Sequence, residues 1–435
     1  MRKINLHILP LLFLLYCFSF LDRTATGAAR VYGLENDIGI TSAQFGWTLS
    51  IFFVTYVLFE IPGNLCLKRF SPRRWLSFIT LGWGAASLGI AFSNNFATLM
   101  TTRALLGLFE SSMFPGSIMY LTYWYRPEER ATAIARFACA APISGFIGGL
   151  TAYGAGHIHA FGWEPWRHVI LIQSAPTLLL GVIVYFMLPN EPATATFLTD
   201  KERVYAVRRL QPGFTESMPS SDDGDSTQEM WATFFCGYNL AFATQSFCFG
   251  TVGYAMSLLM PTVLSHMGFD GLTVQLLTLP SHIISFTLVN VVSWNSDRTG
   301  DRSKHVMVAA AISAIFFMAL GIIGDQVRWV RYGFLIIAAI PLNSASPAHL
   351  AWNAIKIRMA TVTAMLPMAS NIGGIVAGQL FPAHDAPAYR MSNFILFGLL
   401  IVHVVISVGL RVYFKYANQR LARLSNGTSL WQFPL

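Results

Sequence analysis

The chain has 435 residues, of which 54% are hydrophobic and only 11% are charged. Soluble globular proteins carry about 25% charged residues, so this chain lacks the polar surface that soluble domains of its length require. Its mean hydropathy is +0.51. The composition therefore predicts an integral membrane protein and excludes secreted, cytosolic and nuclear proteins.

The net charge of +8 does not indicate a protein that binds nucleic acid. The basic residues form short groups between apolar segments and no continuous stripe for a phosphate backbone. This spacing is typical of the cytoplasmic loops of a membrane protein. The groups are Lys68, Arg69, Arg73 and Arg74; Arg126 and Arg130; Arg298, Arg302 and Lys304; Lys356 and Arg358; and Lys415, Arg420 and Arg423.

The five cysteines lie singly in or beside apolar segments, and none forms a C-x-x-C pair. Structural zinc requires clustered ligands, and a disulfide framework requires a Cys-dense secreted chain. The sequence also contains no nucleophile–base set and no phosphate-binding loop. We therefore predict no metal site, no cofactor and no enzymatic activity.

Twelve apolar segments of about membrane-spanning length follow one another along the chain. They cover residues 5–27, 44–66, 75–93, 96–120, 131–153, 168–188, 232–260, 273–295, 305–324, 331–350, 360–382 and 391–414. The first has an alternative interpretation as a signal peptide, because Arg2 and Lys3 precede it and small residues follow it. The ion pair Asp22-Arg23 in its last turns favours a retained helix.

The distribution of Lys and Arg predicts the orientation. With the N-terminus inside, 21 of the 29 Lys and Arg residues fall in inside segments and five in outside loops, while Arg23, Arg103 and Arg136 fall within spans. Both termini are therefore expected in the cytoplasm. Asn426-Gly427-Thr428 matches a glycosylation acceptor, but on this side of the membrane it should remain unmodified.

The longest non-apolar stretch divides the spans into six and six. It predicts an N-terminal six-helix bundle (1–190), a cytoplasmic linker (191–230), a C-terminal six-helix bundle (231–415) and a cytoplasmic tail (416–435). Within the linker, residues 198–202 resemble the start of an amphipathic helix, and the Ser/Asp-rich residues 220–228 are predicted to be disordered. An all-α membrane protein with two six-helix halves is the architecture of a rocker-type transporter.

Charged residues inside the predicted spans are concentrated in the first half. A charge at mid-bilayer costs at least about 2.5–3.5 kcal/mol, so each one needs a partner or a function. Arg23 and Arg103 are expected in the outer half of the membrane at similar depth, because the first span runs outward and the fourth runs inward. Glu110 lies two turns after Arg103 on the same helix face. Two arginines and two carboxylates, Asp22 being the second, are therefore expected to line one cavity.

This arrangement predicts a site for an anion. Arg23 and Arg103 are candidates for substrate binding, because guanidinium pairs with carboxylate and stays charged when desolvated. Asp22 and Glu110 are candidates for proton coupling, because burial raises the pKa of a carboxyl group and a nearby Arg lowers it. The alternative is two ion pairs that only join helices. Glu60 and Arg136, near cytoplasmic ends, are weaker candidates.

Two neutral residues complete the predicted site. Tyr56 in the second span can donate a hydrogen bond, and Asn371 in the eleventh is a buried amide that needs partners. The glycine-rich segments 145–149 and 371–374 are expected to allow close helix packing. The histidines His282, His349 and His403 are scattered along the sequence, and we assign them no role.

Several segments resemble the anion:cation symporters of the major facilitator superfamily, closest to the fungal allantoate-permease and nicotinate-permease type. They are LDRTATGAARVYGLENDIGIT, FFVTYVLFEIPGNLCLKRFSPRRW, RALLGLFESSMFPG, WYRPEERATA, LPNEPATATFLT and NIGGIVAGQLFPAHDAP. The resemblance covers residues 4–420. It implies twelve helices, proton-coupled uptake of small organic anions, and roles in coupling or binding for Asp22, Arg23, Tyr56, Arg103, Glu110 and Asn371.

Two internal segments of the chain differ from that group. Residues 67–70 lack the acidic residue of the loop after the second helix, and the stretch from Trp352 to Asn371 is several residues short. The shortened stretch favours one alternative, a nutrient receptor or inactive variant that binds without transporting. We expect a monomer in the plasma membrane with a carboxylate substrate; nicotinate, allantoate, pantothenate and other acids remain open.

Overall fold

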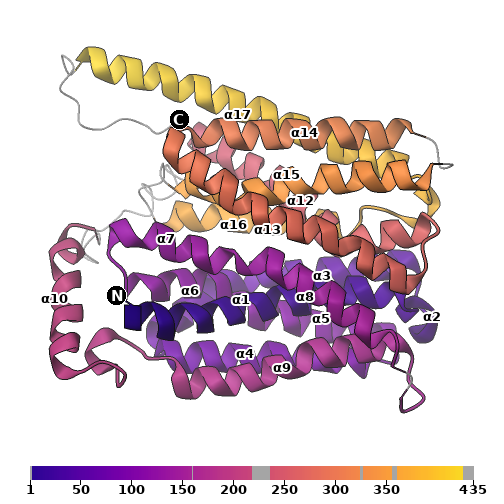
Figure 1. The fold of residues 1–435 in the computed structure, drawn as a ribbon, viewed down its shortest axis with the longest axis horizontal. Helices are drawn as coiled ribbons and strands as arrows, with labels where there is room; N and C mark the ends of the chain where they lie inside the picture. Colours follow the sequence, from indigo (N-terminus) through magenta and orange to yellow (C-terminus); the bar gives the residue numbers. More distant parts are fainter. Residues whose placement is uncertain (1, 159, 218–235, 324–326, 355–359, 425–435) are drawn as a thin grey trace. The chain divides into compact units, whose positions relative to one another are not determined.

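The computed structural model describes residues 2–158, 160–217, 236–323, 327–354 and 360–424, and every regular element in these ranges is helical (Figure 1). The chain divides into two compact units, residues 1–226 and 227–435. Among the described residues, nine helices are long and apolar enough to cross a membrane. The predicted all-helical membrane fold is confirmed. Lys356, Arg358, residues 220–228 and Asn426 lie outside the described residues.

The predicted spans correspond to helices in both units. Unit 1 contains α1 (Arg2–Val31), α2 (Leu34–Ile38), α3 (Ser42–Arg69), α4 (Pro72–Ala91), α5 (Phe96–Glu110), α6 (Met113–Thr122), α7 (Pro127–Ala138), α8 (Ala140–Ala155), α9 (Pro165–Met187), the 3-10 turn η1 (Pro192–Thr194) and α10 (Asp200–Ser217). Unit 2 contains α12 (Gly237–His266), α13 (Gly271–Thr299), α14 (Arg302–Ile322), α15 (Arg328–Ala354), α16 (Ala360–Ala377), the 3-10 turn η2 (Ala383–Asp385) and α17 (Arg390–Leu424).

Two predicted spans are interrupted. The fourth is split into α5 and α6 at Ser111–Ser112, and the fifth into α7 and α8 at Cys139. At the first break the Ser111 hydroxyl donates to the Leu108 carbonyl oxygen at 2.8 Å. Serine hydroxyls that bond to helix carbonyls compete with the regular backbone pattern, which explains a break inside an apolar segment. α17 continues to Leu424, beyond the predicted end of the last span.

The two units pair their helices in the same order. In unit 1, α1 packs on α8 and α9, α4 packs on α5 and α9, and α3 packs on α5. In unit 2, α12 packs on α16 and α17, α14 packs on α15 and α17, and α13 packs on α15. Each unit is therefore the same six-span arrangement, in which the first span contacts the fifth and sixth.

The helix predicted to start in the linker is observed as α10. Thr199 and Glu202 form its N-terminal cap: the Thr199 backbone N–H donates to the Glu202 carboxylate at 2.9 Å, and the Glu202 N–H donates to the Thr199 hydroxyl at 3.4 Å. Lys3 pairs with Glu202 at 2.6 Å. Hydrogen bonds from Lys3 and Thr199 lower the pKa of Glu202 to about 2. α10 therefore lies across the end of unit 1 that holds the N-terminus (Figure 1).

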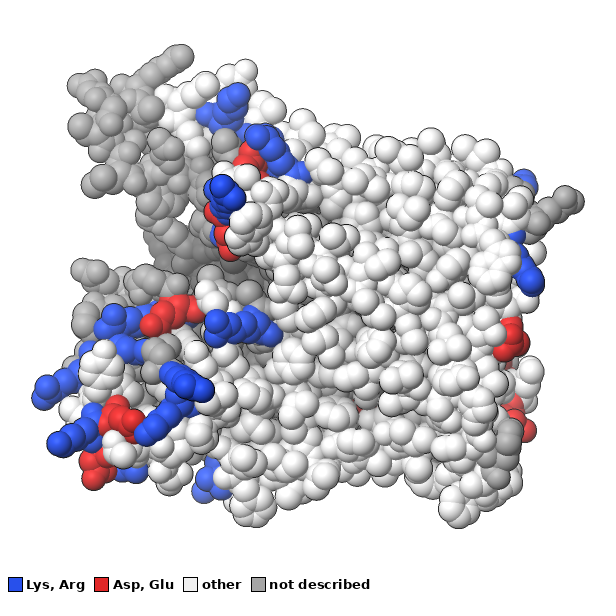
Figure 2. Space-filling view, in the orientation of Figure 1, with Lys and Arg blue, Asp and Glu red and all other residues white. Residues whose placement is uncertain are grey.

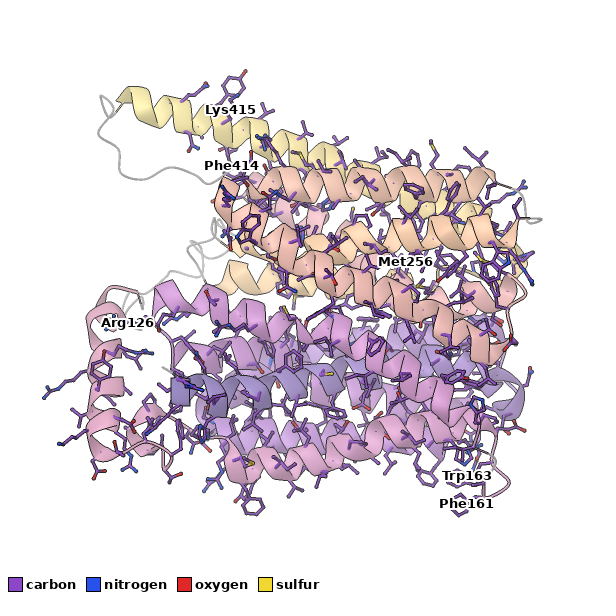
Figure 3. All side chains as sticks on the ribbon, in the orientation of Figure 1. Arg126, Phe161, Trp163, Met256, Phe414 and Lys415 are labelled. Carbon is purple, nitrogen blue, oxygen red and sulfur yellow. The ribbon has the colours of Figure 1, made fainter. Side chains whose placement is uncertain are left out.

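Basic side chains gather at one end of unit 1, and two labelled aromatic side chains lie at the other. Lys and Arg gather at the end formed by the N-terminus and α10, and the wall of the bundle is almost free of charge on the face shown in Figure 2. At that end Arg126 donates from Nε to the Arg209 carbonyl oxygen at 2.8 Å (Figure 3). Phe161 and Trp163 lie at the opposite end (Figure 3). Aromatic rings are enriched where a membrane protein meets the interface.

Small residues allow α12 and α16 to cross closely. A Cβ added at Gly250 would lie 2.5 Å from the Ser370 carbonyl oxygen, and one added at Gly373 would lie 2.6 Å from the Phe247 carbonyl oxygen. Gly373 belongs to the predicted packing segment 371–374. The backbones are therefore in contact at this crossing.

Gly250→Ala is expected to lower the melting temperature of the purified protein by several degrees. The added methyl group has no room against the α16 backbone, and overpacking of this kind costs about 1–3 kcal/mol. Gly253→Ala in the same helix is the matched control, because nothing lies within 4 Å of its added Cβ. Equal melting temperatures of the two variants would contradict the close crossing of α12 and α16.

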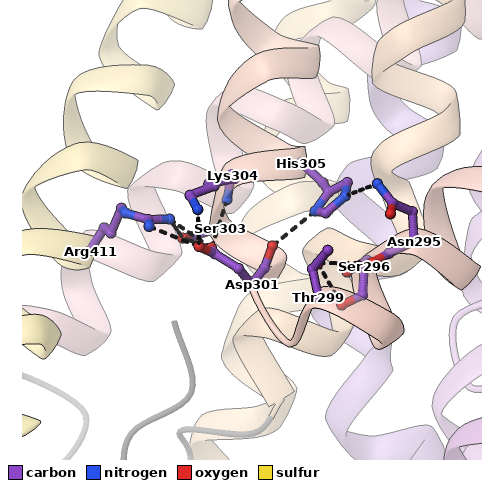
Figure 4. Close-up of polar contacts among 8 residues, drawn as sticks. All are labelled: Asn295, Ser296, Thr299, Asp301, Ser303, Lys304, His305 and Arg411. Atoms are coloured by element: carbon purple, nitrogen blue, oxygen red, sulfur yellow. Dashed lines mark hydrogen bonds and ion pairs between the residues drawn. The ribbon is translucent and has the colours of Figure 1, made fainter.

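Asp301 joins the loop before α14 to α17 (Figure 4). Its carboxylate accepts hydrogen bonds from Arg411 at 2.6 and 2.8 Å and pairs with Lys304 at 3.0 Å. Burial alone would raise the pKa of Asp301, but hydrogen bonds from Arg411, Lys304 and Ser303 outweigh it and hold the pKa well below its usual range. The loop is therefore fixed to the last helix of unit 2.

Asp301→Asn is expected to destabilise unit 2 by about 1–2 kcal/mol at neutral pH, measured as a lower melting temperature. Because the folded pKa of Asp301 lies below its value of about 3.9 in unfolded chains, its stabilisation is present above about pH 4 and is lost as pH falls. The difference between variant and wild type should therefore shrink in acid. Asp297→Asn is the control, since Asp297 is 70% exposed and its pair with Arg302 should contribute little.

Candidate functional site: a buried arginine pair in unit 1

Arg23 and Glu110 form a buried ion pair between α1 and α5. The Arg23 Nη2 atom donates to Glu110 Oε1, and the Ser19 hydroxyl donates to the same oxygen at 2.5 Å. All three side chains are almost completely buried. Ser19 and Arg23 are one turn apart on α1, so this face of the helix is polar inside the bundle. The predicted proximity of Arg23 and Glu110 is therefore observed.

Arg103 lies beside this pair with its hydrogen-bonding capacity incompletely used. It is fully buried, and its Nε donates to the Thr48 carbonyl oxygen at 3.1 Å. Its terminal nitrogens Nη1 and Nη2 have no hydrogen-bond partner among the residues that the structure describes. A buried guanidinium with two donors unsatisfied is energetically unfavourable unless an anion or water binds it.

Aromatic rings from α1 and α3 surround the two guanidinium groups. The Phe52 ring centroid lies 5.0 Å from Arg23 Cζ and 5.1 Å from Arg103 Cζ, so both arginines contact one ring. Arg23 also lies 5.3 Å from the Tyr56 ring, which is itself buried. Cation–π contacts compensate part of the lost solvation. Tyr56 is therefore placed with the arginines, as predicted from its position in the sequence.

Gly107 brings α5 against α3 at the level of this site. A Cβ at Gly107 would lie 2.1 Å from the Phe52 carbonyl oxygen. Gly107 follows Arg103 by one helical turn and therefore lies on the same face. Only glycine permits this approach, which positions Arg103 over the Phe52 ring. Sequence reasoning missed both Gly107 and Phe52, although their helical spacing from Arg103 and Tyr56 is visible in the sequence.

Asp22 faces a different side of α1 from Arg23. Its carboxylate accepts hydrogen bonds from the Ser87 hydroxyl of α4 at 2.9 Å and the Thr177 hydroxyl of α9 at 2.8 Å. Arg23 instead faces α3 and α5 through Tyr56 and Glu110. The expectation that four charged groups line one cavity therefore needs correction. Neighbouring residues on a helix point about 100° apart, which separates Asp22 from the others.

The structure places the remaining candidates in three different helices. Asn371 belongs to unit 2, where its amide oxygen accepts a hydrogen bond from the Tyr254 hydroxyl at 2.7 Å. Glu60 is buried in α3, and Arg136 is exposed on α7. No group of three or more potential metal ligands occurs within the described ranges. The cluster in unit 1 thus provides positive charge, buried donors and aromatic surface, which suits the recognition of a small anion.

Comparison with known proteins agrees with the helical architecture. Residues 12–412 match the family model of the Major Facilitator Superfamily. The solved structure of the xylose transporter XylE from E. coli, in a partially occluded inward-open conformation, is similar with a TM-score of 0.72. The similarity covers 93% of this chain and 97% of that one at 14% identity, which establishes the fold alone. A bacterial homolog of the human lysosomal transporter Spinster gives a TM-score of 0.68.

Similar curated proteins are also transporters. The chain is 34% identical to MFS transporter prlL from a fungal species (strain NRRL 50135), over 98% of this chain and 88% of that protein. It is 30% identical to a putative tartrate transporter from Agrobacterium vitis, over 94% of this chain and 90% of the relative. The chain is therefore a multi-pass membrane transporter that belongs to the Major Facilitator Superfamily.

Proposed function

We propose that the chain is a secondary active transporter that moves a small carboxylate anion together with protons by alternating access. The observation that carries this proposal is the buried Arg103 guanidinium, whose Nη1 and Nη2 have no protein partner within the described part of the chain. A carboxylate would accept two parallel hydrogen bonds from these atoms. Arg23 lies on the same Phe52 ring and supplies the second positive charge.

The net charge of the cluster supports an anionic rather than a neutral substrate. Glu110 neutralises one arginine, so the group formed by Arg23, Arg103 and Glu110 retains one positive charge. Removing a cation from water costs several kcal/mol even after relaxation. An anion that binds here offsets this cost, while a sugar or a cation does not. The relative named as a putative tartrate transporter is consistent with a carboxylate substrate.

Proton coupling is assigned to the two carboxyl groups, Asp22 and Glu110. Glu110 can release Arg23 when protonated, and this would link the charge of the binding site to proton uptake. Asp22 lies among hydroxyl groups and can change protonation without breaking an ion pair. Tyr56 and Asn371 are proposed to bind neutral parts of the substrate.

The assignment of subfamily, membrane and orientation rests on sequence resemblance and charge distribution. We place the chain with the allantoate-permease-like anion:cation symporters, as a monomer in the plasma membrane with both termini in the cytoplasm. The basic end of unit 1, formed by the N-terminus and α10, supports this orientation. Family membership excludes the enzyme alternative. An experiment is needed to distinguish a transporter from a receptor of the same fold that only binds its ligand.

Uptake by the purified chain in proteoliposomes tests the proposal. The panel comprises labelled nicotinate, allantoate, pantothenate and tartrate, with nicotinamide as an uncharged control, in the presence and absence of an inward proton gradient. Gradient-driven accumulation of an acid, without accumulation of nicotinamide, is the expected result. If the labelled acid only equilibrated across the membrane, with or without the proton gradient, proton coupling would be overturned. Saturable binding of the acid without transport would identify a receptor.

A further inference from the structure

Two histidines that are far apart in the sequence meet in the interior of unit 2. His349 in α15 and His403 in α17 have ring centroids 5.6 Å apart, and both are buried. The Phe249 ring of α12 stacks on His349 at 4.3 Å and lies 5.8 Å from His403. These two histidines therefore lie together in the fold. The conclusion from the sequence that they have no role needs revision.

Hydrogen bonding determines which nitrogen of His403 carries the hydrogen. Its Nδ1 lies 3.1 Å from the Gln245 backbone carbonyl oxygen, which can only accept, so Nδ1 must be the donor. In the neutral ring, Nε2 then holds a lone pair. Nε2 is buried and has no hydrogen-bond partner among the described residues. His403 is therefore a base whose acceptor atom is unsatisfied.

A second acceptor beside His403 is also unsatisfied. The Gln245 side-chain Nε2 donates to the Ser407 hydroxyl at 2.6 Å, and that hydroxyl donates to the His403 carbonyl oxygen at 2.7 Å. These bonds leave Gln245 Oε1 without a donor in the described part of the chain. His403 Nε2 and Gln245 Oε1 are thus two buried acceptors without a donor among the described residues. A buried polar atom in this state requires a partner.

We propose that His349 and His403 form a site that binds a single proton within unit 2. Protonation of His403 at Nε2 converts an unsatisfied acceptor into a donor, while Nδ1 keeps its bond to Gln245. The Phe249 ring lies close enough to both imidazoles to stabilise the cation. A second proton on the pair would place two positive charges about 5.6 Å apart, which strongly disfavours it.

Other titratable groups on the surrounding helices have separate partners or positions. They include Cys248 and Tyr254 in α12, His282 in α13, Lys304 and His305 at the start of α14, and Arg411 in α17. Tyr254 binds Asn371, and Arg411 and Lys304 bind Asp301. Residues 365–377 of α16 contain no titratable side chain.

The site adds a proton-dependent step that is distinct from the carboxyl groups of unit 1. Because α12, α15 and α17 all contribute to the cluster, a charge there acts on the contacts of three helices. The pH dependence of transport would then have a component from unit 2. This consequence rests on the proposed transport function, but proton binding by the pair does not.

Histidine-selective ¹⁵N NMR of the full chain in lipid nanodiscs tests proton binding directly. Spectra are recorded from about pH 4 to pH 8, the range in which imidazole normally titrates. We expect one titration step that disappears in His403→Gln and moves in His349→Gln. His282→Gln is the matched control and should leave that step unchanged. Wild-type spectra in which both imidazoles stay neutral throughout would overturn the proposal and indicate that a water molecule supplies the donor.

Uptake measured against pH provides a second readout. In His403→Gln, the acid limb of the uptake profile should flatten while uptake at neutral pH stays within about threefold of wild type. An unchanged profile would contradict a role for the site in transport. If no acid is transported at all, the transport proposal fails, and the NMR titration still decides whether the pair binds a proton. Thermal melting of each variant verifies that it is folded.

Discussion

Arg103→Gln is expected to reduce carboxylate uptake at least about 100-fold without lowering the melting temperature. Loss of a desolvated charged partner costs about 2–5 kcal/mol in binding, and 100-fold corresponds to about 2.7 kcal/mol. The fold should tolerate the change, because Nη1 and Nη2 of Arg103 make no hydrogen bond to any described residue. Removing a buried, incompletely paired cation also removes its desolvation penalty. Uptake in proteoliposomes and melting in detergent measure the two effects.

Arg23→Gln is the matched control for this prediction. Arg23 is paired with Glu110, so its removal leaves a buried carboxylate that keeps the Ser19 hydroxyl as a donor. Loss of one partner of a buried ion pair destabilises a protein by about 3–5 kcal/mol. We therefore expect Arg23→Gln to lower the melting temperature as well as uptake. If Arg103→Gln also melted early and still transported the acid at the wild-type rate, Arg103 would be a structural residue.

Asp22→Asn is expected to separate exchange from accumulation. Asparagine resembles the protonated carboxyl group in size and can keep contacts with the Ser87 and Thr177 hydroxyls. Substrate exchange across the liposome membrane should therefore stay within about threefold of wild type. Accumulation driven by a proton gradient should fall at least about tenfold, since the residue can no longer bind and release a proton. Counterflow and gradient-driven uptake of the same labelled acid measure the two activities.

Glu110→Gln distinguishes the two carboxyl groups. Because Glu110 pairs with Arg23, the neutral variant leaves that arginine without its carboxylate partner inside the bundle. We expect exchange and accumulation to fall together in this variant. Preserved exchange with lost accumulation would instead show that the proton of Glu110, and not its ion pair with Arg23, is what transport requires. Wild-type accumulation by Asp22→Asn would exclude Asp22 from that role.

The spans could be predicted from sequence because lipid imposes a simple requirement. Within a bilayer every backbone polar group must be satisfied internally, so a long apolar segment must be helical. The breaks at Ser111–Ser112 and Cys139 could not be predicted in the same way. They depend on local side-chain bonding, such as that of the Ser111 hydroxyl, which hydropathy does not detect.

The candidate site was predictable in part. The cost of intramembrane charge identified Arg23, Arg103 and Glu110, which the structure brings together. The separation of Asp22 from Arg23 was not predicted, because the facing of adjacent residues depends on where α4 and α9 pack. The meeting of His349 and His403 was missed for the same reason. Their contact is created by the packing of α12 with α15 and α17 and leaves no periodicity in the sequence.

The common helix-pairing order of the two units has an evolutionary consequence. Duplication and fusion of a six-helix ancestor would produce a chain of this kind, with equivalent spans in equivalent contacts. Arg23, Arg103 and Glu110 nevertheless cluster in one copy, and His349 and His403 meet in the interior of the other. Packing geometry and chemical specialisation have therefore diverged at different rates, because a helix crossing constrains residue size more strongly than it constrains the polarity of the inner face.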